Sequence, residues 1–64
     1  MTAEEITKLI DEKISKAAEN RRRIGWCEEK VMAYYYGMAI GMVNAFVAAG
    51  AMTEEDADDY MSAF

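Results

Sequence analysis

The sequence predicts an all-α protein, a small helical hairpin or bundle of two long helices plus a short C-terminal helix, completed by oligomerisation. Three observations predict this fold class. The chain of 64 residues has no proline, and 53% of its residues are hydrophobic. Its apolar residues recur at steps of three and four, as on one face of a helix. Gly25 and Gly50 lie between the predicted segments, where helices commonly end. The length allows one domain, residues 1–64.

The first helix is expected at about residues 2–23. Thr2 is a good N-cap, and Glu5 follows three residues later, as in a capping box. The apolar residues of this segment then form one stripe at helical spacing: Ile6, Leu9, Ile10, Ile14, Ala17 and Ala18. The helix is therefore amphipathic, and its apolar face needs a partner.

The joint around Gly25 allows two interpretations. Apolar residues recur every seven positions straight through Gly25, which would suit one continuous helix with a coiled-coil seam. Lys13 and Asn20, however, occupy the complementary positions and interrupt that seam. We therefore expect a break or bend near Gly25.

The central helix is expected at about residues 26–50, and the chain is organised around it. No residue from Val31 to Met52 is charged, and the segment is apolar nearly all round, as in a helix buried in a core or a membrane. Gly37 and Gly41 lie on a stripe of small residues. Each costs about 1 kcal/mol relative to alanine inside a helix. Close approach of a neighbouring backbone is the natural compensation.

The third helix is expected at about residues 53–63. Gly50 suits the position after a helix end, and Thr53 suits the next N-cap. The first turn of this helix is acidic, where negative charge is favoured. Its apolar edge can fold back on the central helix and consists of Ala57, Tyr60, Met61 and Phe64.

Two covering helices leave a third side of the central helix bare, which predicts a homo-oligomer or burial against another protein. A large exposed apolar patch marks an interaction site, and tyrosine is enriched in binding hot spots. The expected oligomer or partner interface consists of Tyr34, Tyr35, Gly37, Met38, Gly41, Met42, Ala45 and Phe46.

The net charge of −5 comes from one segment, because residues 1–30 contain seven basic and seven acidic residues. The acidic surface expected to meet a partner consists of Glu54, Glu55, Asp56, Asp58 and Asp59. Acidity of this kind disfavours direct binding of nucleic acid. Arg21 to Arg23 with Trp26 could hold a phosphate and a base, but three successive arginines point in different directions.

The composition argues against catalysis, cofactors and metals. There is no histidine to serve as a base or a zinc ligand, and Cys27 is the only cysteine. The acidic run lacks the spacing of a calcium-binding loop. A free thiol and the absence of a signal-peptide pattern fit the cytoplasm. We expect no enzyme activity.

The function expected from the sequence is protein–protein binding, by an inhibitor or adaptor of the type that phages and mobile elements encode. One alternative is an inhibitor whose carboxylates mimic phosphates and compete with nucleic acid. A second is a purely structural oligomer. A third is a small membrane protein that dimerises through the Gly37–Gly41 face.

Overall fold

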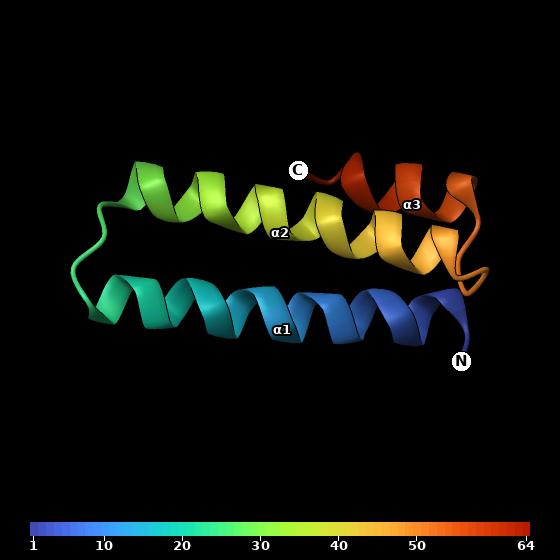
Figure 1. Ribbon diagram of the computed structural model, residues 1–64, viewed down its shortest axis with the longest axis horizontal. Coiled ribbons are helices and arrows are strands. Elements are labelled where there is room, and N and C mark those ends of the chain that lie inside the picture. Colours follow the sequence, from blue (N-terminus) through green and yellow to red (C-terminus); the bar gives the residue numbers. More distant parts are fainter.

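The computed structural model describes all 64 residues and contains three helices, α1 (Ala3–Arg23), α2 (Glu28–Ala48) and α3 (Glu54–Met61). α1 and α2 form an antiparallel hairpin, and α3 folds back along the C-terminal half of α2 (Figure 1). The molecule measures 36 × 18 × 18 Å. The predicted all-helical class with three helices is therefore confirmed, and its completion by other copies stays a prediction.

α1 begins where the sequence predicts because the capping box forms. The Thr2 hydroxyl oxygen accepts a hydrogen bond from the Glu5 N–H at 3.2 Å. The Glu5 carboxylate in turn accepts from the Thr2 N–H at 3.2 Å. Two N–H groups that would lack a helical partner are thereby satisfied.

Both long helices end at a glycine in the left-handed region. Gly25 has a φ of 94°, and its N–H donates to the Arg22 carbonyl while the Trp26 N–H donates to the Arg21 carbonyl. This pair of bonds is the Schellman motif, which needs a residue that tolerates positive φ. The same pair closes α2 around Gly50, which has a φ of 74°. The chain therefore reverses at Gly25, and the continuous helix is not formed.

The helix limits differ from the expected ranges by a few residues, for local reasons. α2 begins at Glu28 instead of residue 26, because Trp26 closes α1 and Cys27 is extended as the N-cap. α2 ends at Ala48, before the Gly50 turn. α3 ends at Met61, with Ser62 as its C-cap.

The core lies where α1, α2 and α3 meet. Its side chains are Ile6, Ile10, Ile14, Ala39, Val43, Met52 and Ala57. Ile10 and Ile14 are fully enclosed, so the predicted apolar stripe of α1 packs against α2. Only nine of the 64 residues are buried. A core of this size leaves much of the apolar surface of α2 exposed to solvent.

We predict that Gly25→Ala lowers the free energy of unfolding by about 1–2 kcal/mol, because the left-handed conformation costs an alanine that much. Gly25→Asn should cost less, since asparagine tolerates this region. Urea denaturation followed by circular dichroism, at one fixed protein concentration, measures both. Equal losses for the two variants would contradict a backbone origin of the cost.

Candidate protein-binding surface

One side of α2 has no covering element in this chain. We call it the bare face of α2. It consists of six small or polar, exposed residues: Ala33, Gly37, Gly41, Asn44, Ala45 and Ala48. A methyl group placed on Gly37 or Gly41 would meet nothing within 4 Å. Close backbone approach within the chain therefore does not account for these two glycines.

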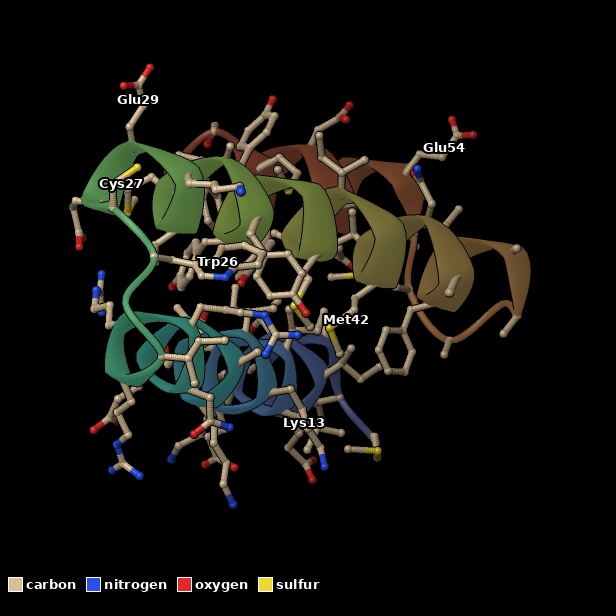
Figure 2. All side chains as sticks on the ribbon, turned by 60° about the vertical axis from the view of Figure 1, so that its left-hand side comes forward. Lys13, Trp26, Cys27, Glu29, Met42 and Glu54 are labelled. Atoms are coloured by element: carbon tan, nitrogen blue, oxygen red, sulfur yellow. The ribbon has the colours of Figure 1, made fainter.

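The predicted interface residues divide between two sides of α2. Gly37, Gly41 and Ala45 lie on the bare face. The larger side chains turn the other way and pack against the core of their own chain: Tyr35, Met38, Met42 and Phe46. Figure 2 shows Met42 between α1 and α2. The sequence could not separate these sets, because α2 is apolar on nearly every side.

Tyr34, the remaining predicted interface residue, belongs to a stack of rings and cations at the α1–α2 turn. The Arg21 guanidinium lies 4.9 Å from the Tyr34 ring centre and 5.3 Å from that of Trp26. It also donates a hydrogen bond to the Tyr34 hydroxyl at 3.3 Å. The Lys30 ammonium lies 5.0 Å from the Trp26 ring centre. Trp26 thus lies between α1 and α2 (Figure 2), and its cation–π contacts stabilise the hairpin at this end.

The other two arginines of the basic run pair with nearby carboxylates. Arg22 donates two hydrogen bonds to Glu28, at 2.7 and 3.0 Å. This bonding raises the pKa of Arg22 and lowers the pKa of Glu28. Arg23 pairs with Glu19 at 3.3 Å. All three arginines therefore have partners within the chain, which leaves no cluster of free guanidinium groups to hold a phosphate.

The acidic residues of α3 face outward. Glu54, Glu55, Asp58 and Asp59 are exposed, and Asp56 is half-buried. Glu54 points away from the molecule in Figure 2. None of the five carboxylates forms an ion pair, and no group of acidic or cysteine side chains is arranged to hold a metal ion. Their structural contribution includes negative charge at the start of α3, next to the Thr53 cap.

A groove that sequence reasoning missed lies between α1 and α2, just beyond the C-terminal end of α3. We call it the apolar groove. Its volume is about 630 Å³, and its walls are Asp11, Arg22, Met32, Tyr35, Tyr60, Ala63 and Phe64. Residues from all three helices and the C-terminal tail form it. No local sequence pattern marks such a site, because its members are up to 53 positions apart.

Two interactions shape the apolar groove. The Phe64 ring packs against three tyrosines, with centre-to-centre distances of 5.6 Å to Tyr35, 6.1 Å to Tyr36 and 5.3 Å to Tyr60. The Tyr60 hydroxyl donates a 2.5 Å hydrogen bond to the Asp11 carboxylate, which ties α3 to α1. Burial, and then this bond and the charge of Asp11, raise the pKa of Tyr60.

The length and composition of α2 would allow it to cross a membrane, and only 17% of its most apolar 18 residues are buried in this fold. Comparison with protein-family models, curated proteins and solved structures found no match. Function must therefore be inferred from the surfaces of the molecule itself.

We predict that the free energy of unfolding falls as the pH rises above about 10. An unfolded tyrosine ionises near pH 10, whereas Tyr60 in the folded chain stays protonated to higher pH. The folded state then binds more protons, so alkaline pH favours unfolding. Tyr60→Phe should flatten this dependence in urea titrations. An identical slope in the two proteins would contradict the role given to Tyr60.

Proposed function

We propose that this protein acts without catalysis by binding other proteins, and that two copies pair through the bare face of α2. The observation that carries the proposal is the exposure of an uncharged side of α2 from Ala33 to Ala48. These 16 residues of helix are about 24 Å long. A charge-free side of that length exposed to water is typical of an interaction site.

The small residues favour another helix as the occupant of the bare face. Helix axes pack 8–10 Å apart depending on the side chains between them. Gly37 and Gly41 have open space around them, so a second helix can approach closely there. Close packing of the two helices would offset the cost of two glycines inside α2. Asn44 would need a hydrogen-bond partner across such an interface.

A protein partner fits the fold better than a lipid bilayer does. α1 runs along α2 over most of its length (Figure 1) and carries eleven charged residues. A membrane around α2 would bring many of those charges into or near hydrocarbon, where each costs several kcal/mol. We therefore propose a cytoplasmic protein, with the membrane interpretation as the weaker alternative.

The distribution of charge favours an antiparallel pair. The acidic residues of α3 lie at the same end of the molecule as Glu4 and Glu5 (Figure 1), whereas Arg21 to Arg23 lie at the other end. A parallel pair would bring two acidic ends together. An antiparallel pair separates them and places each near the basic end of its partner, which lowers the repulsion.

We further propose that the paired molecule is an inhibitor or adaptor that presents α3 to a basic partner. The five α3 carboxylates form no ion pairs within the chain, so they are available to cations elsewhere. The same observation supports a second candidate function, in which the carboxylates mimic phosphates and compete with nucleic acid for a basic protein. If the paired molecule binds no other protein, its role is limited to assembly.

We predict that Gly41→Leu abolishes pairing while the single chain still folds. The leucine has room in the monomer, but it would separate two α2 helices packed on this face. Light scattering should change from twice 7.2 kDa to 7.2 kDa, with helicity unchanged. Glu12→Leu, at an exposed position of α1, is the control and should remain paired. A Gly41→Leu protein that remains paired refutes the interface.

A second prediction separates phosphate mimicry from other protein binding. Reversing the charge of exposed α3 residues, in Glu55→Lys with Asp59→Lys, should abolish competition with nucleic acid for a captured basic partner. The matched control reverses Glu12 and Glu29, two exposed acids outside α3 that form no ion pair. Competition assays on both double variants test this. Mimicry fails as an explanation if both compete equally well.

A further inference from the structure

The apolar groove has the dimensions and the lining of a binding site. Its volume of about 630 Å³ lies within the range of 300–1,000 Å³ typical of ligand pockets. Two of its large apolar side chains are exposed to solvent, with 49% of the surface of Met32 and 45% of the surface of Phe64 accessible. The groove lies at the C-terminal end of α3, because Tyr60, Ala63 and Phe64 form part of its wall.

We propose that the apolar groove binds a basic segment of a partner protein. The aliphatic part of a lysine or arginine would lie on Met32, Tyr35 and Phe64, with its charged group at Asp11. This inference deepens the protein-binding function proposed above by naming the chemistry of the partner. It uses a different side of α2 from the bare face, so each can fail separately.

One end of the groove carries several features that attract a cation. The Asp11 carboxylate accepts one hydrogen bond from Tyr60 and retains further acceptor positions. The C-terminal end of α3 points toward the same end, and helix C-termini carry partial negative charge. The rings of Tyr35, Tyr60 and Phe64 add the electron-rich faces that favour cation–π contact.

No lysine or arginine of this chain forms an ion pair with Asp11. Arg22 also lines the groove, but its guanidinium is held by two hydrogen bonds to Glu28. It lies eleven residues from Asp11 on α1, or about 16 Å away. No basic residue occurs from Val31 to Phe64. The side of the molecule that carries α3 is therefore negative and attracts a basic partner.

A shallow acidic depression on the other side of Tyr60 supplies a second contact. It is lined by Ala3, Glu4, Thr7, Asp56, Asp59 and Tyr60. Its carboxylates are not arranged to hold a metal ion, whereas a long flexible cation can reach them. Asp11 in the groove and Glu4 in the depression lie seven residues apart along α1, or about 10 Å. About three extended residues cover that distance, so the partner segment has basic residues at about that spacing.

The test uses blocked alanine-based peptides of about ten residues, each with one leucine and two arginines about three positions apart. Titration into the isotope-labelled protein, followed by amide chemical shifts, locates the site. We expect shifts at Met32, Tyr35, Tyr60 and Phe64. The peptide with glutamine in place of arginine should bind several-fold more weakly, and the peptide with glutamate should not bind.

Matched variants test the position of the cation. Asp11→Asn keeps an acceptor for Tyr60 but removes the charge, and should weaken binding about threefold. Glu12→Gln removes the same charge next to Asp11 but outside the groove, and should have no effect. The Gly41→Leu variant should bind the peptide normally, which separates this proposal from the pairing of α2.

Three results would overturn the proposal. The glutamine peptide could bind as tightly as the arginine peptide. Asp11→Asn and Glu12→Gln could weaken binding equally, which would indicate an effect of net charge alone. The groove residues Met32 and Phe64 could also shift on dilution without any peptide, which would mean that a second copy fills the groove.

Discussion

The packing of one isoleucine stripe against one apolar helix holds this protein together. Ile6, Ile10 and Ile14 of α1 are enclosed by α2 and α3. Each buried side chain of this size contributes about 1.5–3 kcal/mol. The two glycine turns reverse the chain, so that α2 and α3 both pack against this same core. A domain of 64 residues can bury only a modest share of its surface, so α2 is covered on two sides and left open on a third.

The features that the sequence predicted correctly depend on neighbours in the chain. The Thr2 capping box, the reversal at Gly25 and the end of α2 near Gly50 each involve residues within one or two turns. The stripe of α1 was also predictable, because its other faces are charged. The orientation of α2 could not be predicted, since the sequence of a helix that is apolar all round does not indicate which side faces the core. Met42 and Phe46 therefore pack inward, although they were expected to face a partner.

The apolar groove was beyond sequence reasoning for a different reason. Asp11 and Tyr60 are 49 positions apart and meet only because α3 returns to α1. Phe64 was recognised as part of an apolar edge, but its contacts with three tyrosines depend on where α3 ends. Together with the bare face of α2, this groove gives this small protein two separate contact surfaces. The bare face is uncharged and suits a helix, whereas the apolar groove has Asp11 at one end and suits a cation.

The chain has a single tryptophan, and its place at the α1–α2 turn makes it a local optical probe. Arg21 and Lys30 both lie near the indole ring, so its emission responds when that end of the hairpin opens. α3 lies toward the opposite end of the molecule (Figure 1). Detachment of α3 alone would leave the fluorescence unchanged while ellipticity decreases, so a mismatch between the two signals would reveal a partly unfolded intermediate.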